Sequence, residues 1–406
     1  MLDWAKRSGI LLFLDSNDYQ LPHSSYDCLL AVGKARTSNV ENELLRPENV
    51  HGFGDWIFGH ICYDHKNLIE TKLVSSHPEK NGFPLSYFFV PQTVCYINKA
   101  QTALTIASFD NPVAIYREIN TPDAEQEADI PKLQFTSVTD KERYLETIGK
   151  LRIHIADGDC YEINYCTEGF CENVEVDPFQ VFNALNRLSP APYAAYYRLD
   201  DKYMMCASPE RYLRRNSDQI LSQPIKGTAR RDKDPAKDME IKDQLRNDIK
   251  ERAENVMIVD LVRNDLARCC QTGSVGVEEL FGIYSFPQVH QMVSTVTGTV
   301  KENMSFAELI RNTFPMGSMT GAPKHKVMQL IDVYEQTRRE LFSGTVGYIA
   351  PNGDFDFNVV IRSLFYNAVT KRLSYQTGGA ITYDSDAEKE WEEMRLKAWA
   401  LERIFE

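Results

Sequence analysis

The sequence predicts an α+β protein. Strand-like segments fill its first third, strands and helices are mixed in the rest, and regular strand–helix–strand alternation is absent. The chain has 406 residues, of which 43% are hydrophobic and 25% charged, as in a folded globular protein. Length alone favours two or three domains, although one large β-rich unit also fits.

The N-terminal third reads as mostly antiparallel sheet. Short β-rich runs at 10–14, 28–32 and 86–90 alternate with turn clusters up to about residue 119. The acidic, proline-bounded stretch 120–131 then reads as a surface connection. We therefore expect an N-terminal β-rich region at 1–130 and a second region at 131–406.

The second region begins with an amphipathic helix. Apolar residues recur at helical spacing over 139–157, with Thr139 as the expected N-cap and Glu142 three residues on. The segment 238–270 contains neither Gly nor Pro, which predicts one continuous helix.

A last helix is expected from about residue 387 to the C-terminus, where Ser385 and Glu388 form a capping pair. Between the helices lie further strand-like segments, at 193–198, 203–207, 212–214, 295–300, 345–349, 358–365 and 372–375.

Composition excludes several classes of protein. A formal charge of −13 argues against a nucleic-acid-binding protein, and the longest N-terminal apolar run is too short for a membrane span or a secretory signal. The nine scattered cysteines fit neither a disulfide framework nor a zinc site. There is no phosphate-binding loop and no dinucleotide fingerprint. We expect a cytoplasmic protein without membrane or nucleic-acid partners.

Two acidic pairs stand out, Glu251 with Glu254 and Glu390 with Glu393. Each pair is spaced i, i+3 on an expected helix, so both of its carboxylates share one face. Such carboxylates can hold Mg²⁺, which prefers oxygen ligands. Taken alone, a solvated helix face explains each pair better.

Lys226 lies in the segment 223–228 (QPIKGT), where Pro and Gly bracket it. Taken alone, it reads as an ordinary surface charge. To act as a nucleophile it must lose its proton, and a fall in its pKa from about 10.4 to about 7–8 would need burial or nearby cations such as Arg230 and Arg231.

Three further features could bind an anion or donate a proton. Glu210 follows an expected strand at a proline turn, where a raised pKa would make it a general acid. The Gly- and hydroxyl-rich segment 315–324 opens a helix whose free N–H groups suit an anion. Arg362 lies among apolar residues and needs an anionic partner. A loop carboxylate, a helix cap and a structural ion pair are the simpler alternatives.

Six ordered motifs carry a family resemblance from about residue 134 to the C-terminus. They are 158–164 (GDCYEIN), 208–210 (SPE), 254–266 (ENVMIVDLVRNDL), 317–324 (GSMTGAPK), 361–362 (IR), and 384–386 (DSD) followed by Glu390, Glu393 and Lys397. Together they resemble the chorismate-binding enzymes, which include anthranilate, isochorismate, salicylate and aminodeoxychorismate synthases. The first third resembles that family only loosely.

The resemblance implies one interlocked α+β unit of stacked, mostly antiparallel sheets with helices on their outer faces, which replaces the estimate of two or three domains. It also implies that 131–406 is the chorismate-binding catalytic region. Within the family, Lys226 is similar to the lysine of aminodeoxychorismate synthases, where anthranilate synthases usually carry Ala. The implied reaction converts chorismate and ammonia to 4-amino-4-deoxychorismate, toward 4-aminobenzoate and folate.

The resemblance also implies a role for each motif residue. Lys226 would be a covalent nucleophile at C2 of chorismate, and Glu210 the general acid for the departing hydroxyl. Substrate-binding groups would be Arg362, Lys397, Ser318, Gly378 and Gly379. Mg²⁺ would be held by Glu254 and Glu393, with Glu251 and Glu390 contacting it directly or through water.

Some positions depart from the family pattern. Gln291 replaces the usual His, with His290 beside it, Phe342 stands where many relatives have Tyr, and Ala380 replaces a Gly. Isochorismate and salicylate synthases need a lysine at the position of Glu162, which disfavours addition of water at C2.

Two alternatives remain open, an anthranilate synthase component and a catalytically silent homologue. Lys226 argues against the first, and joint retention of the nucleophile, the general acid and the four carboxylates argues against the second. No amidotransferase-type cysteine is recognisable, so we expect a separate glutamine amidotransferase subunit to supply ammonia.

Overall fold

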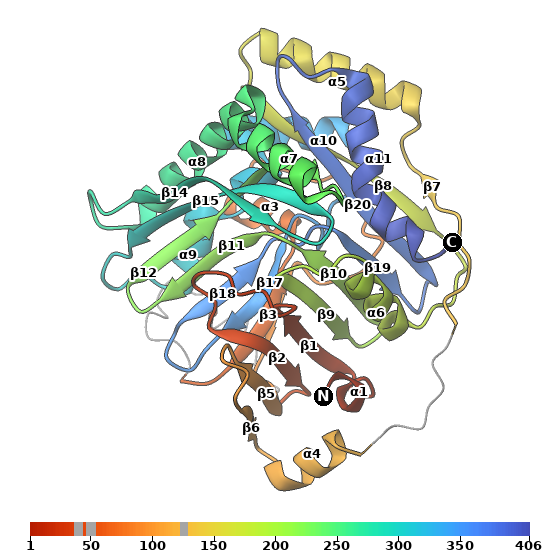
Figure 1. Ribbon diagram of the computed structural model, residues 1–406, viewed down its shortest axis with the longest axis vertical. Helices are drawn as coiled ribbons and strands as arrows, with labels where there is room; N and C mark the ends of the chain where they lie inside the picture. Colours follow the sequence, from red (N-terminus) through yellow and green to blue (C-terminus); the bar gives the residue numbers. More distant parts are fainter. Residues whose placement is uncertain (36–43, 46–53, 122–128) are drawn as a thin grey trace.

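Two large antiparallel sheets form the protein in the computed structural model, which describes residues 1–35, 44–45, 54–121 and 129–406 (Figure 1). In sheet A the strands follow the order β16-β8-β20-β19-β10-β9-β1-β2-β5-β6, with β7 also on β8; in sheet B the order is β13-β15-β12-β11-β18-β17-β3-β4, with β14 also on β15. This architecture confirms the predicted α+β class.

The strands of sheet A are β1 (Ile10–Asp15), β2 (Tyr26–Val32), β5 (Thr93–Asn98), β6 (Leu104–Ser108), β7 (Thr136–Ser137), β8 (Glu162–Cys171), β9 (Tyr193–Leu199), β10 (Lys202–Ser208), β16 (Gly321–Ala322), β19 (Ser363–Asn367) and β20 (Arg372–Ile381). Those of sheet B are β3 (Ile57–Ile61), β4 (Ser86–Phe89), β11 (Arg211–Asn216), β12 (Gln219–Gln223), β13 (Ile225–Arg230), β14 (Gly276–Ser285), β15 (Val289–Thr299), β17 (Thr345–Ile349) and β18 (Phe355–Asn358).

The N-terminal strands lie within both sheets. In sheet A, β1 pairs with β9, and in sheet B, β3 pairs with β17. Of the expected surface connection at 120–131, residues 122–128 lie outside the described part of the chain.

The largest hydrophobic core lies between the two sheets. Leu12 and Tyr197 contribute to it from sheet A, and Phe58 and Phe357 from sheet B. Leu11, next to Leu12 on the same strand, belongs instead to a second core on the other face of sheet A. Successive residues of a strand point to opposite faces, so β1 serves both cores.

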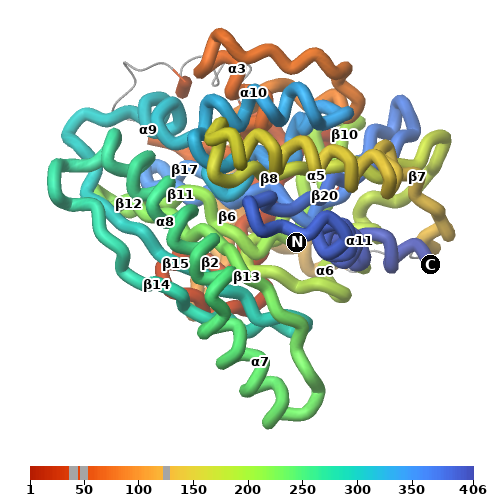
Figure 2. Tube along the Cα trace, turned by 90° about the horizontal axis from the view of Figure 1, so that it is seen from above, coloured from red at the N-terminus to blue at the C-terminus, as the bar shows by residue number. Residues whose placement is uncertain are grey.

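Helices cover the outer faces. Sheet A carries α5 (Lys141–Ala156), α6 (Pro178–Leu188), α10 (Lys324–Tyr334) and α11 (Ala387–Arg403), and sheet B carries α7 (Pro235–Asn247), α8 (Ile249–Cys269) and α9 (Phe306–Thr313). A third core joins α5, α10 and α11 to β8, and Figure 2 shows α5 and α10 side by side. Shorter elements are α1 (Leu2–Ala5), η1 (Tyr63–His65), α3 (Lys66–Ile69), α4 (Pro112–Ile119) and η2 (Gly317–Met319).

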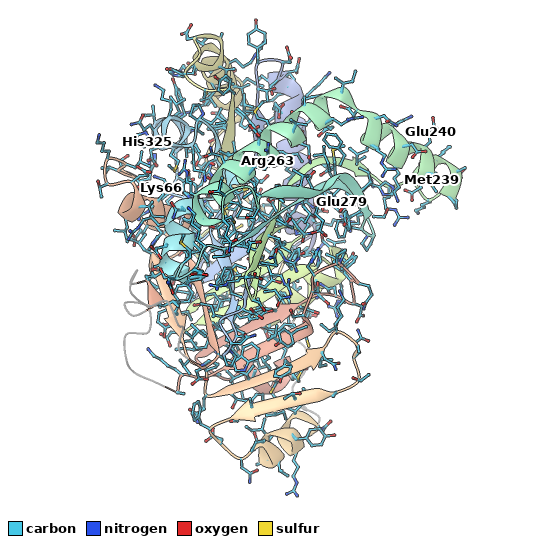
Figure 3. All side chains as sticks on the ribbon, turned by 90° about the vertical axis from the view of Figure 1, so that its left-hand side faces the viewer. Lys66, Met239, Glu240, Arg263, Glu279 and His325 are labelled. Carbon is cyan, nitrogen blue, oxygen red and sulfur yellow. The ribbon has the colours of Figure 1, made fainter. Side chains whose placement is uncertain are left out.

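Helix α7 projects from the body of the molecule (Figure 2), and Figure 3 labels Met239 and Glu240 on it. Among the described residues, no helix is both long and apolar enough to cross a membrane.

Three predictions about helix boundaries were wrong. Asp140, not Thr139, caps α5, and Asp386, not Ser385, caps α11. The continuous helix expected over 238–270 is two helices, because Asp248 adopts an extended conformation and its side chain accepts from the Glu251 N–H to start α8.

The strand expected at 358–365 was also wrong as a single element. The chain leaves sheet B at Asn358 and enters sheet A at Ser363, so the crossing segment belongs to neither sheet. Arg362 lies in this crossing with φ of +53°, a left-handed conformation uncommon for a residue with a side chain.

Candidate functional site

The site begins with an ion pair between the edges of the two sheets. Lys226 lies on β13 at the edge of sheet B, and Glu162 is the first residue of β8, next to the edge of sheet A. The Lys226 Nζ donates to Glu162 Oε1 at 2.5 Å. Both are buried, with 9% and 3% of their surfaces exposed.

The surroundings of Lys226 differ from those that its sequence context suggested. Burial is the largest influence and lowers the pKa of Lys226, but the charges of Glu162, Glu254 and Glu210 raise it above its ordinary value overall. Carboxylates, not cations, therefore face this amine. Arg231, one of the cations expected to help, is paired with Asp238 at 2.7 Å. The resting amine is an ammonium.

Glu210 lies in the same neighbourhood, in the turn between β10 and β11, and is 4% exposed. Burial raises its pKa to about 7, against the opposing effects of the Ser318 hydroxyl, the Lys226 charge and the Ile225 N–H. At neutral pH about half of the Glu210 carboxyl groups therefore hold a proton, as a general acid requires.

Helices α8 and α11 bring the two acidic pairs together. The Lys250 Nζ lies 3.6 Å from Glu254 Oε1 on α8 and 3.8 Å from Glu390 Oε1 on α11. Burial, then the charges of Glu254 and Glu393, raise the pKa of Glu251 to about 7. Four carboxylates from two helices thus share one electrostatic environment.

The chemistry of these carboxylates fits Mg²⁺. Glu254 Oε1 is buried and accepts no hydrogen bond from any described residue, so this oxygen is available to a metal ion. Even so, no three acidic, His or Cys side chains in the described ranges are close enough to hold an ion as they stand. Glu390 accepts from the Ser385 hydroxyl at 2.8 Å, and Glu393 pairs with Lys397 at 2.8 Å. To surround a cation, these two side chains must turn away from their present partners.

Arg362 enters the site from the crossing between the sheets. Burial lowers the pKa of its guanidinium, and the Glu393 charge opposes that effect. Its backbone is held in place because its carbonyl accepts from the Ala207 N–H at 3.1 Å. This left-handed segment places the Arg362 guanidinium close enough to Glu393 on α11 for their charges to interact.

The two glycines of β20 have different surroundings. A Cβ on Gly378 would lie 2.1 Å from the Tyr165 carbonyl oxygen, so close pairing with β8 requires glycine there. A Cβ on Gly379 would lie 3.3 Å from Glu390 Oε2, beside the acidic pair. The Lys397 Nζ donates to the Gly378 carbonyl at 2.9 Å.

All eleven predicted site residues thus fall in one neighbourhood. Contacts or electrostatic interactions connect Ser318, Glu210, Lys226, Glu254, Glu251, Glu390, Gly378, Gly379, Lys397, Glu393 and Arg362. The role of each residue remains a prediction.

Sequence reasoning missed Glu162 as a site residue. It appeared only as the position where isochorismate synthases need a lysine, although a carboxylate inside the motif 158–164 was a usable signal. His290 does not stand in for the missing family His, because its ring contacts Ser285 and Asp238 at 2.9 and 3.0 Å. The adjacent Gln291 is buried, and its Oε1 has no hydrogen-bond partner among the described residues.

Phe342 and Ala380 are integrated into the fold. Phe342 is part of the core between the sheets, and Ala380 pairs with Asn164 in the ladder between β20 and β8. Neither departure from the family pattern disrupts the architecture.

Comparison with known proteins finds relatives that carry two names. Aminodeoxychorismate synthase component 1 of Klebsiella aerogenes is 40% identical over 253 residues, covering 62% of this chain and 55% of that protein. The Escherichia coli protein of the same name is 38% identical and covers 65% and 59%. The chain thus spans less than two thirds of the length of these relatives. An anthranilate synthase component I-like protein of Synechocystis is 32% identical and covers 87% and 73%.

The fold matches solved structures along nearly its whole length. Anthranilate synthase component I of Streptococcus pneumoniae superposes with a TM-score of 0.80 at 23% identity, covering 95% of this chain and 94% of that one. The menaquinone-specific isochorismate synthase of Escherichia coli gives 0.79 at 17% identity, covering 100% and 91%. The family model of the chorismate binding enzymes matches residues 20–403. This chain belongs to the chorismate binding enzyme family.

Proposed function

We propose that the chain is the chorismate-aminating component of an aminodeoxychorismate synthase, making 4-amino-4-deoxychorismate through a covalent bond to Lys226. The observation that carries this proposal is the enclosure of Lys226 beside Glu210 in one buried site. An amine that can add to a ring carbon lies next to a carboxyl that can hold a proton at neutral pH. Relatives named aminodeoxychorismate synthase component 1 support it.

In the first half-reaction the neutral Lys226 amine adds to C2 of chorismate. The new C2–N bond forms as the ring double bonds shift and the C4–O bond breaks. Glu210 gives its proton to the departing hydroxyl, which leaves as water. Glu210 ends as a carboxylate, and the lysine nitrogen ends as a secondary ammonium bonded to C2.

In the second half-reaction ammonia adds at C4 and the double bonds shift back. The C2–N bond breaks with its electron pair returning to Lys226, which leaves as a neutral amine. The new C4 ammonium gives one proton to the Glu210 carboxylate, which restores the acid. The sum is chorismate plus ammonia to aminodeoxychorismate plus water, with both residues returned to their starting states.

The remaining site residues position the anionic substrate. Glu254, Glu393, Glu251 and Glu390 would hold Mg²⁺, which supplies positive charge for a substrate carboxylate when bound. Arg362 and Lys397 add two cations and Ser318 a hydroxyl to the same site, with Gly378 and Gly379 keeping backbone close by. These groups offset locally the net charge of −13.

We further propose that a separate glutamine amidotransferase subunit delivers the ammonia. The designation "component 1" of the relatives supports a second component for those proteins. If adding such a subunit does not raise the rate with glutamine above the rate of this chain alone, the partnership is wrong.

Anthranilate synthesis is the second candidate, because the anthranilate synthase component I-like protein of Synechocystis covers more of this chain than the first relatives do. Its amine enters at C2 and its product loses pyruvate. A lysine bonded to C2 would block that entry, so Lys226 favours amination at C4.

The deciding experiment identifies the product formed from chorismate, ammonium and Mg²⁺ by mass spectrometry, with Lys226→Ala as the comparison. We expect aminodeoxychorismate from the wild type and a rate at least about 100-fold lower from the variant, the size of effect usual for lost catalytic groups. Anthranilate from the wild type, or full activity of the variant, would refute the proposal.

A further inference from the structure

The position of Glu162 is fixed by the loop that also carries Ser318. Glu162 pairs with Ala322 across the short β16–β8 ladder, and the Asn164 N–H donates to the Thr320 carbonyl at 2.8 Å. A Cβ on Gly321 would lie 2.1 Å from the Glu162 carbonyl oxygen, so only glycine allows this approach. The carboxylate is therefore presented to Lys226 from a rigid backbone.

Lys226 faces carboxylates from several elements. They are Glu162 on β8, Glu210 in the β10–β11 turn, Glu254 on α8 and Glu393 on α11. Within the described part of the chain, only Glu162 forms a hydrogen bond or an ion pair with the Lys226 ammonium. The other three act on it through their charge.

An ammonium has no lone pair, so Lys226 cannot attack a carbon until a proton leaves. Lys226 is 9% exposed, and a bound substrate would cover it further, which hinders loss of the proton to water. Glu210 in its acid form cannot take that proton, and among the described residues its carboxylate form makes neither a hydrogen bond nor an ion pair with Lys226. The acceptor in direct contact is Glu162.

We propose that Glu162 is a further catalytic residue, which accepts the proton of the Lys226 ammonium directly and so frees the amine for attack. The N–H bond of Lys226 breaks and an O–H bond forms on Glu162, with no change in the charge of the pair as a whole. The proton stays within the site, since Lys226 returns as a neutral amine after each turnover. This inference rests on the proposed covalent function.

Transfer within the pair has a consequence that can be measured. In the wild type the proton moves from Lys226 to Glu162 and need not reach the solvent. The population of neutral Lys226 therefore does not depend on pH while Lys226 and Glu162 together hold one proton. In Glu162→Gln the ammonium must lose its proton to solvent, and the neutral fraction rises about tenfold per pH unit below the lysine pKa.

The test measures the first half-reaction alone, without ammonia, by rapid quenching and intact-mass detection of chorismate bonded to Lys226 with loss of water. Rates are taken from about pH 6 to pH 8 for wild type and Glu162→Gln. Because Glu210 titrates in both proteins, its effect cancels in the ratio of variant to wild-type rates. We expect that ratio to be about 0.01 at neutral pH and to rise about tenfold per pH unit.

Two variants separate proton transfer from structure. Glu162→Asp keeps a proton acceptor. We expect its rate to be lower than that of the wild type but to change with pH in the same way. Glu168→Gln removes another buried carboxylate of β8, one that pairs with Arg372, and we expect it also to run parallel. If Glu162→Asp shows the same rising ratio as Glu162→Gln, the carboxylate only positions Lys226 and the inference fails.

Failure of this inference is distinct from failure of the proposed function. If the wild type forms no adduct at Lys226, the covalent mechanism itself is wrong. If the adduct forms and the Glu162→Gln profile runs parallel to the wild type, or its rate is higher at neutral pH, only the role of Glu162 is refuted.

Discussion

At the scale of single residues, burial gives Glu210 a function at a cost in stability. Its pKa is raised from the ordinary 4.5 to about 7, mainly by burial. Below about pH 4.5 the group is protonated in the folded and unfolded chain alike, so it has no effect on stability there. Between the two values the unfolded chain releases the proton and the folded chain keeps it, so stability falls as pH rises through 7.

The variant Glu210→Gln removes that pH dependence. We expect its free energy of unfolding to rise by about 2 kcal/mol relative to the wild type when the pH is raised from about 5 to 8, while turnover falls at least about 100-fold. Urea unfolding at the two pH values measures the first effect. Glu172→Gln, an exposed change just after β8, should show no such difference. Equal pH dependence in Glu210→Gln and wild type would contradict the assigned pKa.

Gly321 supports the site through the absence of a side chain. Its φ is +137°, and an added Cβ would lie 2.1 Å from backbone of Glu162. We expect Gly321→Ala to lower the free energy of unfolding by at least about 2 kcal/mol and to reduce activity, because the loop must move away from β8. Thermal unfolding measures the stability, and the rate of adduct formation at Lys226 measures the activity.

Gly149 provides the matched control. It lies exposed within α5, and an added Cβ would meet nothing within 4 Å. Gly149→Ala should raise stability by about 0.5–1 kcal/mol through the higher helix propensity of alanine, with activity unchanged. If Gly149→Ala lost as much stability as Gly321→Ala, the space available for a Cβ would not explain the effect at Gly321.

At the scale of elements, the break between α7 and α8 sets the place of the acidic pair on α8. Asp248 starts α8 by accepting from the Glu251 N–H at 2.9 Å. We expect Asp248→Ala to lower the free energy of unfolding by about 1 kcal/mol, because the first turn of α8 loses its cap. Since the turn that carries Glu251 and Glu254 then frays, the Mg²⁺ dependence of activity should also weaken. Asp234→Ala removes the N-cap of α7, away from the carboxylates. Asp234→Ala should lower the free energy of unfolding by a similar amount and leave the Mg²⁺ dependence of activity unchanged. If Asp234→Ala and Asp248→Ala change the Mg²⁺ dependence equally, Asp248 has no specific role.

The sequence could predict features that depend on local spacing. The i, i+3 spacing placed each glutamate pair on one helix face, and α8 and α11 present them accordingly. It could not predict the break at Asp248, since an aspartate within a polar helix and one that caps a new helix look alike without the tertiary packing. Likewise the apolar run 358–365 reads as one strand, because composition does not record that the chain changes sheets there.

Glu162 shows a different limit of sequence reading. Lys226 and Glu162 are 64 positions apart, and their 2.5 Å contact exists only because the edges of two sheets meet. Local patterns carry no information on such a contact. The prediction that cations would surround Lys226 failed for the same reason, since neighbours in sequence were taken for neighbours in space.

At the scale of the whole molecule, the acidic site joins the two layers. Helix α8 packs on β13 and β15 of sheet B, while α11 packs on β20 of sheet A. Burial and then repulsion from neighbouring carboxylates raise the pKa of Glu251 and Glu390, whereas the Lys397 charge lowers that of Glu393. A cation bound by both helices would relieve that repulsion and hold the layers together, so it should stabilise the whole fold.

We therefore expect Mg²⁺ to raise the free energy of unfolding by about 1.4 kcal/mol for each tenfold excess over its dissociation constant, without any substrate. The rise should be larger at pH 8 than at pH 6, because protons compete for Glu251, whose pKa is about 7. Differential scanning calorimetry across a Mg²⁺ series measures it. Glu254→Gln should abolish the effect, whereas Glu240→Gln, an exposed change on the projecting helix α7 (Figure 3), should retain it. If Mg²⁺ stabilises Glu254→Gln as much as the wild type, the ion binds elsewhere, and the two layers are held together by packing alone.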